Sequence, residues 1–401
     1  MPASHLTNRI PSWLFLMGLV TALGPLAVDM YLPSFTSIAR DFGAPTSHIE
    51  RTLASYLLGL ALAQLAYGPI TDRYGRKIPL AAGLSIFIFA SLMSSLADSA
   101  GELTFWRVVQ AFGSAAGMVI PRAVIRDNLE TRDAAKALSL IMLIMGVTPI
   151  LAPLLGGQVL LFWNWRGIFL IMALGSALLL AGALMTMRET LPEDRRTPLA
   201  WKRIALSYAD LLRDKVFIGY SLAGGFGSAG MFSYIAGSPR TFIEIYGVDP
   251  SRFGLLFGIN AIALILASQV SARLLSRHTP QRLLRRAQAG MMIAVLTGLA
   301  LTLTGMITLP LLMACLVCYM ACQGFVNPNA AAMALDRQGH RLGVASALMG
   351  SMQMLAGSLA GMSISAWHSD TALPLTGILA LCATLSCLFG RMAMNAAAPG
   401  A

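Results

Sequence analysis

Charge is scarce in this chain. Only 12% of its 401 residues are charged, whereas 56% are hydrophobic and the mean hydropathy is +0.69. A soluble globular protein carries about 25% charged residues, and even a large soluble core still needs a polar shell around it. The composition therefore argues against a water-soluble fold and predicts helices that lie in a lipid bilayer.

The sequence also lacks the motifs of common enzymes and pumps. It contains no phosphate-binding loop of the form Gly-x-x-x-x-Gly-Lys, so we expect no ATP-driven pump. Cys315 and Cys318 have the spacing of a metal-binding pair, but no second pair accompanies them, and a small apolar helix residue is the favoured interpretation. The five histidines are scattered over loops and segment ends: His5, His48, His278, His340 and His368. We expect no catalytic residue, no metal and no cofactor.

Basic residues outnumber acidic ones, 29 to 18, and they are unevenly placed. When the amino terminus is set inside the cell and the loops are made to alternate, nearly all Lys and Arg residues fall on the inner side. Arg107 lies within a span, and the outer loops hold only Arg40, Arg51, Arg166, Arg240 and Arg252. This bias follows the positive-inside rule and predicts that both termini are cytoplasmic. The excess charge thus does not indicate nucleic-acid binding.

Twelve apolar segments have about the length that a bilayer requires. They cover roughly 12–34, 47–70, 77–97, 103–125, 136–160, 167–187, 216–237, 253–275, 286–307, 310–333, 343–366 and 372–393. The longest polar interruption lies near the middle of the chain. We therefore predict an all-α membrane protein with an amino-terminal six-helix bundle (1–187), a cytoplasmic central loop (188–215) and a carboxy-terminal six-helix bundle (216–401).

Four motifs carry a resemblance to a known family. The charged stretch at 68–77, Gly-x-x-x-Asp-Arg-x-Gly-Arg-Lys, resembles the signature loop of the major facilitator superfamily. The segment 24–33 resembles the first-helix motif of its Bcr/CflA drug-resistance branch, and 103–113 is similar to the fourth-helix motif of proton-coupled members. The segment 152–157 resembles the fifth-helix antiporter motif, although Ala152 replaces the usual glycine. The motifs occur in the order that the family shows, and the similarity covers nearly the whole chain.

The resemblance implies a twelve-helix transporter of the bacterial inner membrane. Its expected activity is multidrug efflux, in which small, moderately hydrophobic organic compounds are exported in exchange for protons. A proton-coupled carrier of a natural metabolite, such as a nucleoside or an amino-acid derivative, is an alternative, and a non-transporting membrane sensor or enzyme is a more remote one. The expected partners are a drug-like substrate, protons and the lipid bilayer, with no nucleic acid, and the chain is expected to act as a monomer.

Two charged residues lie deep within the predicted spans. Asp29 is the only carboxylate deep in the first six spans, and Arg107 lies at a similar depth, because a helix rises about 1.5 Å per residue. An ionised side chain in hydrocarbon costs several kcal/mol and usually faces a partner or a wet cavity. We predict that Asp29 carries the proton and that Arg107 takes part in coupling. A fixed ion pair without a transport role, or an Asp29 that reaches the outer interface, remains an alternative.

The charged loop is predicted to form a cytoplasmic gate. Asp72 is placed to accept hydrogen bonds from the amino terminus of a neighbouring helix, and Arg76 can pair with Asp127. The family pattern implies that these contacts latch the cytoplasmic side in the outward-open state. The alternative is a tight turn whose basic residues only fix the topology. The candidate gate residues are Gly68, Asp72, Arg73, Gly75, Arg76, Lys77 and Asp127.

The antiporter-like motif contains Pro153, Gly156 and Gly157. Together with Pro149, Pro153 removes helix hydrogen bonds, so we expect the helix to bend there. The two glycines would let another helix come close, and a bend near the junction of the bundles would limit ion leakage. A generic kink is the alternative.

Aromatic and amide side chains within apolar spans are candidates for the substrate cavity, because such a lining suits moderately hydrophobic organic molecules. Several of the amides are expected only to join helices. The candidates are Tyr31, Tyr56, Gln64, Gln110, Phe226, Phe232, Tyr234, Asn260, Gln269, Asn327, Asn329 and Gln353.

Overall fold

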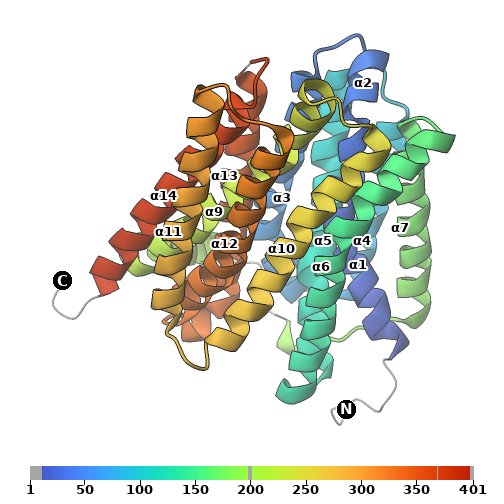
Figure 1. Cartoon of the computed structure of the whole chain (residues 1–401). Coiled ribbons are helices and arrows are strands. Elements are labelled where there is room, and N and C mark those ends of the chain that lie inside the picture. Colours follow the sequence, from blue (N-terminus) through green and yellow to red (C-terminus); the bar gives the residue numbers. More distant parts are fainter. Residues whose placement is uncertain (1–10, 197–200, 368, 398–401) are drawn as a thin grey trace.

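The computed structural model of the chain consists of helices that run mainly along one axis (Figure 1). It describes residues 11–196, 201–367 and 369–397. The first half contains α1 (Ser12–Asp29), η1 (Leu32–Ser34), α2 (Phe35–Asp41), α3 (Thr46–Tyr74), α4 (Lys77–Ser95), α5 (Ala100–Asn128), α6 (Thr131–Phe162), α7 (Arg166–Thr186) and η2 (Glu193–Arg195). The second half contains α8 (Trp201–Arg213), α9 (Lys215–Pro239), η3 (Arg240–Ile245), α10 (Pro250–Leu274), α11 (Pro280–Leu303), α12 (Leu309–Leu335), η4 (Gly339–Arg341), α13 (Leu342–Ala366) and α14 (Leu373–Ala397).

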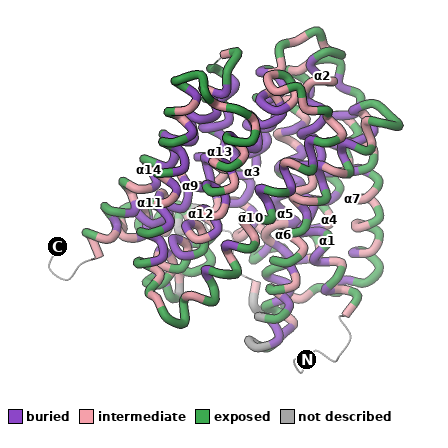
Figure 2. The backbone as a smooth tube through the Cα atoms, in the orientation of Figure 1, coloured by how far each residue is buried: buried purple, intermediate pink, exposed green. Residues whose placement is uncertain are grey.

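The prediction of a multi-span helical membrane protein is confirmed. In the described part of the chain, 11 helical segments are long and apolar enough to cross a membrane. The remaining predicted span, 216–237, corresponds to α9, a helix of 25 residues that is rich in glycine and serine. Most of α9 is buried against its neighbours (Figure 2), so protein rather than lipid surrounds this helix.

The helices form two bundles. In the first, α5 packs against α3 and α4, while α1 packs against α5 and α6. In the second, α9 packs against α12, α13 and α14. The two bundles meet along α3 with α13 and along α6 with α10, which run side by side in Figure 1. Large apolar side chains such as Phe15, Leu178 and Ile293 point outwards and are exposed, as lipid-facing residues are.

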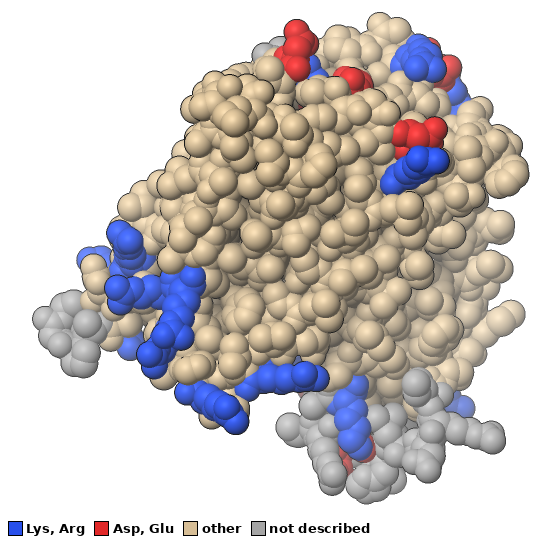
Figure 3. Space-filling model, in the orientation of Figure 1, with Lys and Arg blue, Asp and Glu red and all other residues tan. Residues whose placement is uncertain are grey.

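The two ends of the molecule differ in charge. We call the end where α1 begins and α14 ends the basic face, because Lys and Arg dominate it in Figure 3. At the other end, the opposite face, basic and acidic residues lie together. There Arg166 pairs with Asp41, and Arg240 pairs with Glu244. A broad uncharged band separates the two faces in this view.

The predicted central loop contains a helix, α8. Its Tyr208 donates a hydrogen bond to the carbonyl oxygen of Leu65 on α3, with an O···O distance of 3.2 Å. Its Asp210 lies 3.5 Å from the guanidinium of Arg341, next to α13. The helix therefore contacts both bundles near the basic face.

Candidate functional site

Arg107 is completely buried in α5, and none of the described carboxylates forms an ion pair or hydrogen bond with it. Its guanidinium donates hydrogen bonds to the side-chain oxygen of Gln110 at 2.5 Å and to the carbonyl oxygen of Ala27 at 2.9 Å. It also lies 4.2 Å from the ring centroid of Tyr56 and 4.7 Å from that of Tyr31, which are cation–π distances. Three predicted cavity residues therefore surround Arg107 within the amino-terminal bundle.

Asp29 is the last residue of α1, and its side chain is buried. The contact of Arg107 with Ala27 places the two charged residues at a similar depth, as expected. Among the described residues, however, Oδ1 of Asp29 has no hydrogen-bond partner, and no ion pair joins Asp29 to Arg107. Asp29 is near enough to Tyr56 on α3 and Tyr234 on α9 to interact with both electrostatically. It therefore lies where the two bundles meet.

The glycines of the antiporter-like motif allow two close approaches of the backbone. A Cβ atom at Gly156 would overlap the carbonyl oxygen of Met30, the residue that follows Asp29. A Cβ atom at Gly157 would lie 3.3 Å from the carbonyl oxygen of Pro250 at the start of α10. The helix α6 extends through Pro153 from Thr131 to Phe162. The motif thus packs against both the turn after Asp29 and the second bundle.

Two predicted cavity residues form a polar pair in the carboxy-terminal bundle. Asn260 on α10 donates a hydrogen bond of 3.1 Å to the hydroxyl of Tyr234 on α9. The ring of Tyr234 stacks on Phe257 with a centroid distance of 5.4 Å. The side-chain oxygen of Asn260 has no hydrogen-bond partner in the described part of the chain. This oxygen is therefore an unsatisfied buried acceptor near Asp29.

The next predicted amides lie in different surroundings. Gln353 donates a hydrogen bond of 2.9 Å to the side-chain oxygen of Asn327, and both are half-buried. Gln64 lies opposite Gly350, so it faces the other bundle.

The remaining candidates mainly connect helices. Phe226 stacks on Phe389 with a centroid distance of 5.5 Å, and Phe232 packs against Gly357. Asn329 donates to the Ser271 hydroxyl at 2.8 Å, which joins α12 to α10, and Gln269 is exposed on the surface.

The charged loop forms a network within the amino-terminal bundle. Arg76 is buried and pairs with Asp72 at 2.7 Å and with Asp127 at 2.9 Å. Burial lowers the pKa of Arg76, but its hydrogen bonds to the two carboxylates outweigh this effect and raise the pKa above its ordinary value. Lys77 donates to the carbonyl oxygen of Leu184 at 3.1 Å. Arg73 is exposed, and nothing lies within 4 Å of a Cβ atom placed on Gly68.

Glu189, which the sequence analysis does not single out, completes this network. Its carboxylate accepts hydrogen bonds from the backbone N–H groups of Arg76 at 2.8 and 3.0 Å and of Lys77 at 3.1 Å, and from two N–H groups of its own loop. Gly75 makes this possible, because its φ of 84° favours glycine and a Cβ atom would overlap the carboxylate. Burial raises the pKa of Glu189, but the four backbone donors lower it below its ordinary value. Glu189 thus caps the start of α4.

Two helical bundles with unpaired buried polar groups at their junction define the class of polytopic membrane transporters. The sequence profile of the Major Facilitator Superfamily matches residues 17–361. The chain therefore belongs to this superfamily, whose members are transporters and not enzymes.

Its relatives confirm the resemblance to the Bcr/CflA branch. The chain is 32% identical to the bicyclomycin resistance protein homolog of Haemophilus influenzae over 93% of both chains. It is 30% identical to the multidrug resistance protein MdtL of Escherichia coli over 91% of both chains. It is also 38% identical, over 93% of both chains, to the uncharacterized MFS-type transporter YdgK of Bacillus subtilis. The chain is thus a membrane transporter related to drug-resistance transporters.

Solved structures agree with the fold. A peptide transporter, POT, in complex with sulfate superimposes with a TM-score of 0.76 at 13% identity, over 98% of this chain and 96% of the other. A bacterial homologue of the human lysosomal transporter Spinster superimposes with a TM-score of 0.69 at 16% identity, over 97% and 98% of the two chains. At these identities the similarity establishes the fold alone.

Proposed function

We propose that this protein exports small, moderately hydrophobic organic compounds in exchange for protons across the bacterial inner membrane. The proposal depends on one observation, the buried carboxylate of Asp29 at the junction of the two bundles, where Oδ1 has no hydrogen-bond partner among the described residues. An unpaired carboxylate in such a place is costly when ionised and stable when protonated. The names of the relatives, which refer to drug resistance, support the choice of substrate. The excess of basic residues at the basic face supports a cytoplasmic location for both termini.

The proposed cycle uses Asp29 as the group that alternates between charged and neutral. When Asp29 binds a proton, the junction between the bundles loses a buried charge and can close around a dry interface. When substrate enters beside Tyr234 and Asn260, it competes with the neutral carboxyl for the same space and promotes release of the proton. Arg107 stays in its own cluster of hydrogen bonds and aromatic rings, and its hydrogen bond to the carbonyl oxygen of Ala27 holds the end of α1 that carries Asp29.

In the proposed cycle, this conformation is one of the two end points. The contacts between bundles include Gly157 against Pro250 and a hydrogen bond of 2.7 Å from Ser358 to the carbonyl oxygen of Ala54. Thr46 also donates a hydrogen bond to Glu244 at the opposite face. These contacts lie towards the opposite face, which we take as the outer side. The conformation is therefore closed towards the outside in this proposal.

The charged loop is proposed to act in the other half of the cycle. In this conformation Asp72 pairs with Arg76 and keeps about half of its side chain, 55%, exposed. It is therefore accessible to a helix amino terminus of the second bundle when the basic face closes. The ion pair between the buried Arg76 and Asp127 holds the loop in place meanwhile.

The proposal can be tested with the purified protein in sealed vesicles under an imposed pH gradient. We expect one or more compounds of a drug panel to move against the proton flux, and we expect Asp29→Asn to abolish the exchange that the gradient drives. Asp98→Asn is the matched control, because Asp98 is 91% exposed at the opposite face, and it should transport normally.

Three outcomes would count against the proposal. Gradient-driven exchange that persists in Asp29→Asn would remove the role of Asp29. Transport of nucleosides or amino-acid derivatives, with no drug of the panel transported, would favour the metabolite carrier. Absence of any proton-linked transport would overturn the function.

A further inference from the structure

A second carboxylate, Glu50, is buried at the junction of the bundles. It lies near the start of α3, with 0% of its surface exposed. Neither of its two carboxylate oxygens has a hydrogen-bond partner in the described residues. A buried ionised carboxylate without hydrogen bonds costs several kcal/mol, and the group usually becomes neutral instead.

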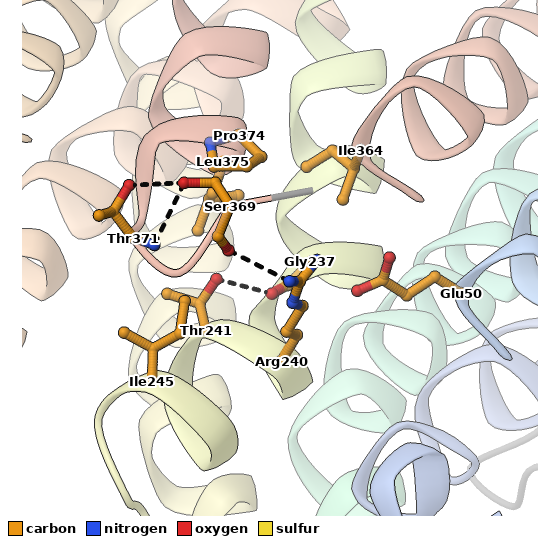
Figure 4. A pocket seen from close by; sticks show the side chains of 10 residues that line it. All are labelled: Glu50, Gly237, Arg240, Thr241, Ile245, Ile364, Ser369, Thr371, Pro374 and Leu375. Atoms are coloured by element: carbon orange, nitrogen blue, oxygen red, sulfur yellow. Dashed lines mark hydrogen bonds between the residues drawn. The ribbon is translucent and has the colours of Figure 1, made fainter. Parts of the chain in front are cut away.

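The surroundings of Glu50 come from both bundles. Figure 4 shows its side chain entering a small pocket from α3 on one side, while Arg240 and Thr241 of η3 line the other side. Ile364 of α13 and Leu375 of α14 supply apolar surface. Glu50 can therefore meet water only if the second bundle moves away from α3 at this end.

The cation nearest to Glu50 in this pocket already has other partners. Arg240 lies 3.8 Å from the carboxylate of Glu244 and donates a hydrogen bond of 3.1 Å to the carbonyl oxygen of Ser369. No ion pair links Arg240 to Glu50 among the residues described. Two other charged groups are nearby. Arg51 is exposed on α3, and Asp370 is exposed in the loop after α13, between the pocket residues Ser369 and Thr371. With Arg240 paired to Glu244, the neutral form of Glu50 fits this pocket best.

The segment that faces Glu50 has an irregular backbone. Arg240 to Ile245 form a π-helical turn that follows α9 directly. Such turns are rare and occur frequently at functional sites. Thr46, at the start of α3, donates a hydrogen bond to Glu244 of this turn. The turn thus connects the two bundles at the opposite face, beside the buried carboxyl.

We propose that Glu50 is a proton-binding gate residue: its carboxyl is protonated while the bundles are packed together at the opposite face, and it gives the proton to water when they separate there. Closing this face then takes one proton from that side onto Glu50, and opening returns it. The inference rests on the proposed function, because it requires that the bundles alternate. It adds a second proton site, distinct from Asp29, that biases the conformational equilibrium by pH.

The test measures the separation of the bundles at the opposite face by double electron–electron resonance. Spin labels are attached at Leu96→Cys and Met306→Cys, two exposed positions in loops of different bundles, after the five native cysteines have been replaced by serine. We expect the population with the longer distance to grow as the pH is raised from about 5 to about 8. A carboxyl group in water is ionised throughout this range, so a rise in pH favours the separated state, which has released the proton. Glu50→Gln should lose this shift and keep the short distance at both pH values.

Two controls make the result specific. Glu102→Gln, an exposed carboxylate at the same face on α5, should keep the pH-dependent shift. The measurement is repeated with Asp29→Asn, in which any remaining shift cannot come from Asp29. Normal thermal stability of Glu50→Gln would show that the variant is folded. Its short distance would then result from the missing titratable group and not from misfolding.

The inference is overturned if the labelled protein shows no pH-dependent shift, if Glu50→Gln retains that shift, or if this variant adopts the longer distance at both pH values. Transport in vesicles is recorded separately. If the protein exchanges drug for protons but fails this test, only the role of Glu50 as a gate residue is refuted. If the distances change as expected but no exchange occurs, the proposed function is refuted.

Discussion

Two buried charged residues of the amino-terminal bundle are held in different ways. Arg107 is fixed by an amide, a carbonyl oxygen and two aromatic rings, so its position is determined by neutral groups. Asp29 has a free oxygen and no positively charged partner within hydrogen-bonding distance among the described residues. The first arrangement suits a permanent charge, and the second suits a group that gains and loses a proton.

The contact between Gly156 and Met30 gives a prediction at the level of one atom. Gly156→Ala places a methyl group against the backbone carbonyl of Met30, which belongs to the turn after Asp29. Because backbone cannot move away easily, we expect the variant to lose about 1–3 kcal/mol of stability and most of its transport. The measurement is thermal unfolding in detergent together with exchange in vesicles.

Gly175→Ala is the matched control for that substitution. Gly175 also lies inside a helix, α7, but nothing lies within 4 Å of a Cβ atom placed on it. This variant should be at least as stable as the parent, because alanine has the higher helix propensity. Equal stability and transport in both variants would show that the close approach at Gly156 has no importance.

At the scale of elements, the start of α4 depends on a residue from a distant loop. The carboxylate of Glu189 caps four backbone N–H groups, and its pKa is lowered in the folded protein from an ordinary value of 4.5. A carboxylate with a lowered pKa stabilises the fold above its ordinary pKa, and this contribution is lost as the pH falls through the lowered value. We therefore expect Glu189→Gln to lower the melting temperature by about 2 °C at neutral pH. The difference from the parent should shrink as the pH falls below 4.5 and vanish below the lowered pKa.

Glu193→Gln provides the comparison for this prediction, because Glu193 is 89% exposed in the same part of the chain. Its melting temperature should equal that of the parent across the pH range. A Glu189→Gln variant that matches the parent at neutral pH would mean that the cap does not stabilise α4.

Much of the helical layout could be predicted, because a long apolar segment in a bilayer must satisfy its backbone hydrogen bonds internally and therefore forms a helix. The pair of Arg76 and Asp127, which are separated by 51 residues, could be predicted because both residues lie at the cytoplasmic ends of predicted spans. The capping by Glu189 was not, since it depends on a loop that folds back from more than a hundred residues away. The burial of Glu50 and the π-helical turn beside it were hidden for the same reason, because tertiary packing creates both.

At the scale of the whole molecule, alternating access requires α3 and α13 to separate near the opposite face. A Cβ atom on Gly361 would lie 3.3 Å from Cβ of Ala54, which is close to the separation in a disulfide. Ala54→Cys combined with Gly361→Cys, in a background without other cysteines, should therefore cross-link on oxidation. We expect exchange in vesicles to stop after oxidation and to recover after reduction.

Each single cysteine variant serves as the control and should be insensitive to oxidant. Undiminished exchange by a fully cross-linked protein would contradict the proposed motion. It would show that the bundles need not part along this line.

The glycine- and serine-rich sequence of α9 bears on how the protein is made. Its glycine and serine residues contribute little transfer free energy, and α9 is not among the described helices that are apolar enough to cross a membrane by themselves. Its neighbours α12, α13 and α14 are synthesised later, and they bury most of its surface. A nascent chain that ends shortly after Pro239 should therefore hold α9 in the bilayer only in part, and completion of the second bundle should secure it. Membrane insertion of this helix is then a late event of biosynthesis, governed by its protein neighbours rather than by lipid.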